Sequence, residues 1–235
     1  MIIGVVGGMG SYATLNFFER YLNVFEAEKE WDRPRIIIDN RCTMPSRVRA
    51  ILYNENWDDV VDELTDSISR LADSGCNRII LACNTSHVFL NDVFSRKPEL
   101  KPLVVNIIER CALDIKSRNI GDVSLIATEG TILSNIYQSV FERYQVKVNA
   151  PSEDVFSKLR YFIEIVKQNK YTQQTFVEFK DFIEEQPSEV LVLGCTEFPV
   201  IYSKMKNIMI NTSKQIFDPL ESTLFYLHSE FIANK

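Results

Sequence analysis

Short apolar runs alternate with longer segments of helical periodicity along most of the chain. Each run has the length and the Ile, Val and Leu content of a strand that is buried on both faces. The clearest runs are residues 2–6, 35–39, 78–82, 123–127 and 189–193. Such strands, separated by helices, favour parallel sheets that are covered by helices on both faces. The chain is therefore predicted to have an α/β fold.

Weaker patterns fill the segments between these strands. Residues 57–74 have helical periodicity, and Gly75 suits the C-terminal cap of that helix. A helix is also expected after the first strand, with a buried face made of Leu15, Phe18, Leu22 and Phe25. Further strands are predicted at 103–105, 146–149 and 207–211, and further helices at about 107–118, 131–144, 153–168, 172–186 and 218–232.

The two halves of the chain repeat each other faintly. The segment RIILACNTSH (78–87) matches EVLVLGCTEF (189–198), because each has an apolar strand, a small residue, a cysteine and a nearby threonine. The segment GVVGGMGSYAT (4–14) likewise matches SLIATEGTILS (124–134). The repeat predicts two similar α/β lobes that face each other across a cleft, with the active site in that cleft. The first lobe is assigned to 1–105 plus 213–235, and the second lobe to 106–212.

Composition and charge exclude several classes of protein. The chain has 235 residues with a formal net charge of -6, which argues against binding to nucleic acid or an acidic membrane surface. No segment approaches the roughly 20 apolar residues of a membrane-spanning helix. The five cysteines include no CxxC pair and there are two histidines, so no metal site is expected. Reduced thiols and the lack of a signal peptide indicate a cytoplasmic protein.

Cys83 and Cys195 each follow a predicted strand and precede a helix start. Ligands bind outside the carboxyl ends of strands in open parallel sheets, which is where both thiols are expected. The amide groups at a helix start lower the pKa of a thiol, because they carry partial positive charge. Asn84, Thr85 and Thr196 could donate hydrogen bonds to a sulfur or to a substrate carboxylate.

Two thiols in one cleft suit the inversion of an amino acid at Cα. Inversion removes the α-proton from one face and returns a proton to the other, so two bases of similar pKa can exchange roles. This arrangement needs neither a metal nor an organic cofactor. The remaining cysteines, Cys42, Cys76 and Cys111, are expected to be small buried apolar residues.

The motifs together resemble those of the aspartate/glutamate racemase family. They are GGMG with Ala13-Thr14, ACNT with His87, ATEGT, and GCTE, and the resemblance covers about residues 2–220. The most similar branch is that of the aspartate racemases and broad-specificity amino-acid racemases. The resemblance implies two pseudo-symmetric lobes, no pyridoxal phosphate, Cys83 and Cys195 as the catalytic acid and base, a small-molecule amino-acid substrate, most simply aspartate or glutamate, and a homodimer.

The resemblance also assigns the residues that would bind substrate. Arg47, in MPSRV, and Lys167, in IVKQNK, match residues that bind a carboxylate, although Lys170 is a nearby rival of Lys167. An arginine can bind a carboxylate through two hydrogen bonds, and a lysine adds a point charge. His87 and Glu197 are assigned supporting roles. The residues expected to line the cleft are Met9, Asn84, Thr85, Thr128, Thr131 and Thr196.

Some positions depart from the family pattern. Ser11 replaces the proline that follows GGMG, and Ser46 replaces the acidic residue before the loop arginine. Glu129, inside ATEGT, could repel a dicarboxylate or point to solvent. Glu197 could favour the helix dipole as a first-turn acid, or orient a thiol or the substrate ammonium group. These departures concern specificity more than the reaction.

Two alternative functions remain open. One is a different reaction on the same scaffold, such as maleate isomerisation with a single cysteine nucleophile. The other is a relative that binds amino acids without turning them over. The presence of both cysteine motifs favours racemisation.

Overall fold

The computed structural model describes residues 1–234, and its backbone is built around two four-stranded parallel sheets. The predicted α/β class is confirmed. In the first sheet the strand order is β2 (Arg35–Asn40), β1 (Ile2–Gly7), β3 (Arg78–Leu81) and β4 (Val104–Val105). In the second sheet the order is β6 (Lys147–Asn149), β5 (Asp122–Ala127), β7 (Val190–Gly194) and β8 (Gln215–Phe217).

The two sheets have the same strand order. β1 and β5 occupy the second position of their sheets, and β3 and β7 occupy the third. The repeated segments seen in the sequence therefore lie at equivalent places in the two lobes. Every strand pair is parallel, so the carboxyl ends of β3 and β7 lie at the edge of their sheet where ligands bind in sheets of this kind.

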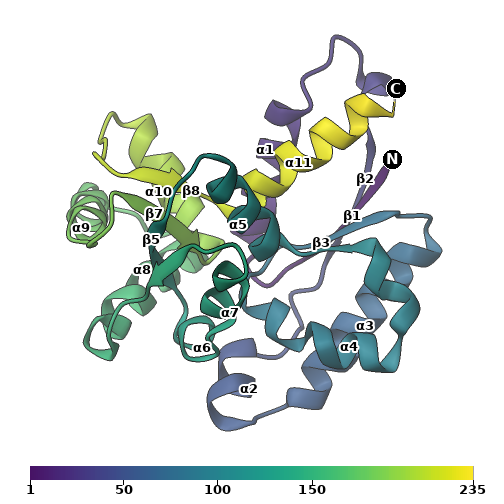
Figure 1. The fold of residues 1–235 in the computed structure, drawn as a ribbon, viewed down its shortest axis with the longest axis horizontal. Coiled ribbons are helices and arrows are strands. Elements are labelled where there is room, and N and C mark those ends of the chain that lie inside the picture. Colours follow the sequence, from purple (N-terminus) through teal and green to yellow (C-terminus); the bar gives the residue numbers. More distant parts are fainter. Residues whose placement is uncertain (235) are drawn as a thin grey trace.

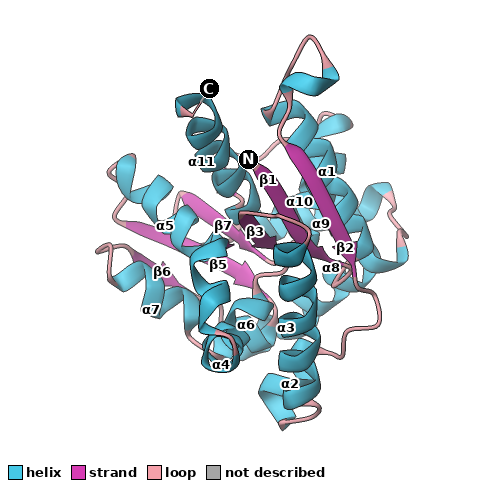
Figure 2. Ribbon diagram, turned by 90° about the vertical axis from the view of Figure 1, so that its right-hand side faces the viewer, coloured by secondary structure: helices cyan, strands magenta, loops and turns pink. Residues whose placement is uncertain are grey.

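Helices cover both sheets (Figure 2). In the first half they are α1 (Ser11–Val24), α2 (Arg47–Tyr53), α3 (Trp57–Asp73), α4 (Leu90–Arg96) and α5 (Ile107–Ser117). In the second half they are α6 (Glu129–Leu133), α7 (Ile136–Glu142), α8 (Phe156–Gln168), α9 (Gln173–Glu184), α10 (Glu197–Asn207) and α11 (Pro219–Ala233). None of the helices in residues 1–234 combines the length and the hydropathy that a membrane-spanning helix needs.

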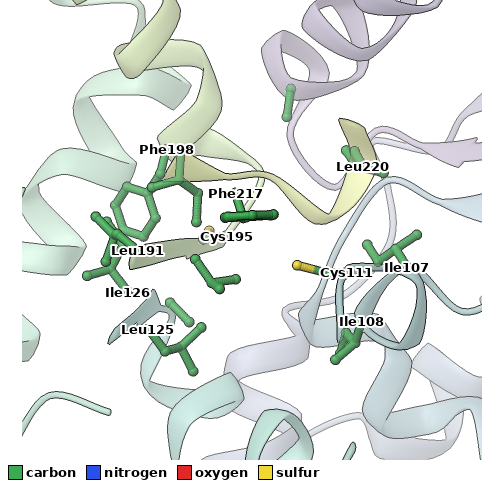
Figure 3. Packing of buried hydrophobic residues seen from close by; sticks show 14 of the residues in the cluster. Ile107, Ile108, Cys111, Leu125, Ile126, Leu191, Cys195, Phe198, Phe217 and Leu220 are labelled. Atoms are coloured by element: carbon green, nitrogen blue, oxygen red, sulfur yellow. The ribbon is translucent and has the colours of Figure 1, made fainter. Parts of the chain in front are cut away.

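The lobes are joined by a continuous core. α5 lies between the two sheets, with β1 and β3 on one side and β5 and β7 on the other (Figure 1). α11 packs against α5, α1 and β7, so the last helix contacts both halves of the chain. The sulfur of Cys111 points from α5 toward Phe217 and Cys195 of the second lobe (Figure 3). One cluster of buried residues accordingly includes side chains from both sheets, such as Ile80 and Leu191.

Several sequence predictions were wrong in detail. The predicted buried face of α1 was right only in part: Phe25 is buried just after the helix and Phe18 and Leu22 pack against the core, but Leu15 is 62% exposed. The buried apolar side chains within the helix are those of Ala13, Phe17 and Tyr21. Phe17 and Tyr21 bury more apolar surface than Leu15 would, because their side chains are larger. The Tyr21 hydroxyl also donates a hydrogen bond to the Pro34 carbonyl oxygen. The single helix predicted at 131–144 is broken, because Asn135 has a φ of 55° and separates α6 from α7. The short helices α2 and α4 were missed.

The predicted strand at 207–211 was also wrong. α10 ends at Asn207, and Met209 has a φ of 62° with its side chain 86% exposed, so the apolar residues of this segment do not enter a sheet. The eighth strand is instead β8, which pairs with β7. The lobe boundaries given above remain a prediction. On sheet pairing alone, β8 belongs with the second sheet, although it follows the assigned end of that lobe at residue 212.

Candidate active site

Cys83 and Cys195 line one cavity of about 230 Å³. Cys83 follows β3 of the first sheet, and Cys195 follows β7 of the second. Most of the other predicted site residues line the same cavity. From the first half of the chain these are Met9, Arg47, Asn84 and Thr85, and from the second half they are Thr128, Lys167, Thr196 and Glu197.

The thiol of Cys195 donates a hydrogen bond to Glu197 Oε2, with a sulfur–oxygen distance of 3.0 Å. Glu197 is the first residue of α10, and 4% of its surface is exposed. Burial raises the pKa of Cys195 well above its ordinary value, and the negative charge of Glu197 raises it further. Cys195 therefore holds its proton when substrate is absent.

The second carboxylate oxygen of Glu197 has a different environment. Oε1 is buried and has no hydrogen-bond partner among residues 1–234. It lies against Gly10, where an added Cβ would come within 2.3 Å of it. Glu197 also lines a neighbouring cavity of about 160 Å³, together with Ser11 and Lys167. Glu197 also lines the cysteine cavity, so this unpaired acceptor could take a hydrogen bond from a substrate ammonium group.

His87 supports the loop that carries Cys83. Its Nδ1 lies 3.0 Å from the Cys83 carbonyl oxygen, and its Nε2 accepts a hydrogen bond from the Ile107 amide at 3.3 Å. These partners assign the proton to Nδ1. Burial lowers the pKa of His87 to about 4, so the ring is neutral. His87 does not line the cysteine cavity but a larger one of about 650 Å³, which neither Cys83 nor Cys195 reaches.

Arg47 supplies an uncompensated positive charge. Its guanidinium donates to the carbonyl oxygens of Pro45 and Met9, at 2.9 and 3.0 Å. Its Nε is buried without a partner, and Arg47 pairs with no carboxylate of residues 1–234. Lys167 makes a weaker contribution, because its Nζ lies 3.6 Å from Glu164 and its side chain is 42% exposed. Lys170 does not line the cavity.

Three threonine hydroxyls tie the two halves of the site together. Thr85 Oγ1 lies 3.0 Å from Thr128 Oγ1 and 2.9 Å from Thr131 Oγ1, and the last two atoms are 2.9 Å apart. Thr131 is fully buried and does not reach the cavity, so its place in the predicted cleft lining is corrected to a supporting one. The ring holds the start of α6 against the loop after Cys83.

Asn84 is oriented by a residue that sequence reasoning missed. The Tyr137 hydroxyl donates to Asn84 Oδ1 at 2.6 Å, and both side chains are buried. Asn84 Nδ2 is left without a partner among residues 1–234, at the wall of the cavity. Nothing in the sequence around Tyr137 distinguishes it from an ordinary core aromatic residue. Met44, Val48 and Ile163 also line the cavity and were missed.

The remaining predicted residues have other roles. Glu129 pairs with Arg160 and does not line the cysteine cavity. Cys76 and Cys111 are buried as expected, whereas Cys42 is exposed, because it lies in the turn after β2. Among residues 1–234 there is no group of three or more His, Cys, Asp or Glu side chains that could hold a metal ion.

Known proteins share this fold. The family described as Asp/Glu/Hydantoin racemase matches residues 6–224. The chain is 23% identical to the broad specificity amino-acid racemase of Bacillus subtilis (strain 168), over 88% of this chain and 89% of that protein. The aspartate racemase structure from Picrophilus torridus has 27% identity and a TM-score of 0.78, covering 98% of this chain and 97% of that one.

Glutamate racemases are similar over a smaller share of their length. The match to the enzyme of Persephonella marina has 24% identity and covers 74% of this chain but 66% of that protein.

An aspartate racemase homologue from Pyrococcus horikoshii OT3 also has this fold. Its structure has 24% identity to this chain and a TM-score of 0.70, and the match covers 97% of this chain and 98% of that one. Because the family match extends over most of the sequence, this chain belongs to the Asp/Glu/Hydantoin racemase family.

Proposed function

We propose that this chain racemises an amino acid, most simply aspartate or glutamate, without a cofactor, using Cys83 and Cys195 as the two acid–base groups. The observation that carries the proposal is that both thiols line one cavity, although they follow strands of different sheets. A bound α-carbon between them would present its two faces to two different sulfur atoms.

The proposed reaction moves one proton on each face. In one direction the Cys83 thiolate removes the α-proton and becomes a thiol, while the electron pair of the broken C–H bond is delocalised into the α-carboxylate. The Cys195 thiol then donates its proton to the opposite face of Cα and becomes a thiolate. The product has the inverted configuration, and the reverse reaction restores the starting protonation states.

The hydrogen bond from Cys195 to Glu197 supports this starting state. A thiol that donates to a carboxylate is protonated, so Cys195 is poised to give a proton to Cα. We assign Cys83 to the D-enantiomer and Cys195 to the L-enantiomer, following the family resemblance. The form with Cys195 protonated would then act on the D-enantiomer.

Substrate carboxylates would be bound by the positive side of the cavity. Arg47 has a buried, unpartnered Nε, and Lys167 borders the same space. Asn84 Nδ2 adds a neutral donor, and Glu197 Oε1 is an acceptor for the ammonium group. Fixed donors and acceptors of this kind stabilise the charge that develops on the carboxylate after proton removal.

The test is a chiral assay in D₂O with purified protein and no added cofactor. Wild-type protein should racemise aspartate or glutamate and introduce deuterium at Cα. Cys83→Ser and Cys195→Ser should each lose racemisation, and each should keep exchange of at most one enantiomer. Racemisation at the wild-type rate by both variants would refute the proposal. Turnover of maleate that depends on a single cysteine would favour the isomerase alternative, and tight binding without turnover would favour an inactive relative.

A further inference from the structure

We propose that the side chain of the substrate extends from the cysteine cavity into a second, mainly apolar cavity between α2 and α8, called the annex here. The annex has a volume of about 190 Å³ and is lined by residues of α2, α6 and α8. The site would then accept amino acids with unbranched apolar side chains longer than that of aspartate, such as methionine. This inference rests on the proposed racemase function and specifies its range of substrates.

The annex adjoins the cysteine cavity. The same five residues line both spaces, namely Ser46, Val48, Thr128, Ile163 and Lys167. Of these, Val48 and Ile163 are apolar, so the passage between the two spaces has apolar walls on the α2 and α8 sides. A side chain that leaves Cα toward these walls would pass from the thiols directly into the annex.

The deeper wall of the annex is also apolar. Phe156 and Leu159 of α8 line the annex and do not reach the cysteine cavity. Both are largely buried, with 9% and 1% of their surfaces exposed, so they form a fixed wall. An apolar stem placed against it would lose contact with water, and each methylene group buried in this way favours binding by about fourfold.

The charged groups around the annex are paired with each other. Glu129 Oε1 accepts hydrogen bonds from Arg160, including one from Nε at 3.0 Å. Glu164 lies 3.6 Å from the Lys167 ammonium group. Two acids and two bases thus offset each other, and the annex offers no unpaired cation for a side-chain carboxylate. Arg47, which has no acidic partner, lines the cysteine cavity and not the annex.

The experiment compares methionine with aspartate in wild type and in Phe156→Trp, which places a larger ring in the annex. The ratio of kcat/KM for methionine to that for aspartate should fall about tenfold in the variant. Phe225→Trp is the matched control, because Phe225 lies on α11, is 50% exposed and lines neither cavity, and it should leave the ratio unchanged. If Phe156→Trp does not fold, Glu164→Trp adds bulk at a half-exposed position of the same annex, and Glu164→Gln is its control because it removes the charge beside Lys167 without adding a ring.

The outcomes separate this inference from the proposed function. Racemisation of aspartate without any activity on methionine, or an unchanged ratio in the annex variants, would overturn the inference and leave the proposed function standing. If neither amino acid is racemised or exchanged, the proposed function fails. Calorimetric titration with methionine then tests whether the annex binds the side chain. Methionine binding that is weakened by Phe156→Trp and not by Phe225→Trp supports the inference, and equal methionine binding by wild type and both variants refutes it.

Discussion

Gly10 lies directly against the carboxylate of Glu197. A Cβ built on Gly10 would fall 2.3 Å from Glu197 Oε1, closer than real Cβ contacts come. The backbone does not itself require glycine, because Gly10 has an extended φ of 178°. The absence of a side chain at position 10 is therefore explained by the space that Glu197 needs beside Cys195.

Gly10→Ala should impair racemisation more than it impairs folding. The added methyl group would push the Glu197 carboxylate out of place and disturb its hydrogen bond with the Cys195 thiol. We expect kcat to fall by at least about tenfold, which corresponds to about 1.4 kcal/mol in the activation free energy. The control is Gly121→Ala, because a Cβ at Gly121 would meet nothing within 4 Å. Equal activities in the two variants would contradict the assigned contact.

Glu197→Gln should lower the pKa of the Cys195 thiol. The variant keeps the shape of the side chain but removes the negative charge that, after burial, contributes most to raising this pKa. The thiolate can be followed by its absorbance and its alkylation rate against pH in a Cys42→Ser/Cys83→Ser background, which removes the exposed thiol and the other cavity thiol and leaves only the buried Cys76 and Cys111 beside Cys195. The exposed Glu26→Gln serves as the charge-matched control. An unchanged titration in Glu197→Gln would show that the carboxylate does not act on the thiol.

The convergence of the two thiols could be predicted from the sequence because the chain repeats itself. Equivalent strands in two similar lobes end at equivalent places, so the duplicated cysteine motifs predicted that Cys83 and Cys195 would meet. The environment of each thiol could not be predicted in the same way. The contacts of Glu197 with Gly10, and of Tyr137 with Asn84, join residues that are far apart in the sequence and depend on how the lobes pack.

Local apolar patterns were a weaker guide than the repeat. The segment 207–211 is as apolar as a short strand, yet its exposed Met209 and positive φ show that no sheet position was available to it. The buried face of α1 was predicted only in part, because Phe17 and Tyr21 have the same helical spacing as Phe18 and Leu22 and both pairs contact the core. Which face becomes buried is decided by the partners of the helix, α10 and α11, and not by its own periodicity.

Tyr137→Phe should weaken substrate binding and reduce stability. The variant removes the hydroxyl that donates to Asn84 Oδ1, leaving a buried acceptor without its partner and the Asn84 amide free to rotate. We expect a loss of about 1–3 kcal/mol in the free energy of unfolding, together with a higher KM. Denaturant titration and steady-state kinetics measure the two effects. Tyr161→Phe is the control, since Tyr161 is 47% exposed, and it should change neither quantity.

The stability of the protein should decrease as the pH falls from about 6.5 to about 4, in part because of His87. Burial lowers the pKa of His87 from 6.5 to about 4, so in this range the unfolded chain binds a proton that the folded chain does not. The part of the free energy of unfolding that depends on a neutral His87 is fully present above pH 6.5. It is lost progressively as the pH falls from 6.5 to about 4. The size of the pKa shift corresponds to about 3 kcal/mol.

His87→Asn isolates this contribution. Asparagine can still donate a hydrogen bond toward the Cys83 carbonyl oxygen, but it does not titrate. The free energy of unfolding of the variant should therefore change less between pH 6.5 and pH 4 than that of wild type, by about 3 kcal/mol. Urea titrations of both proteins across this pH range give the difference between their free energies of unfolding. The pH dependence that comes from all other titratable groups is the same in both proteins and cancels in this difference. Parallel pH profiles would mean that His87 is protonated in the folded protein, and the assigned proton on Nδ1 alone would be wrong.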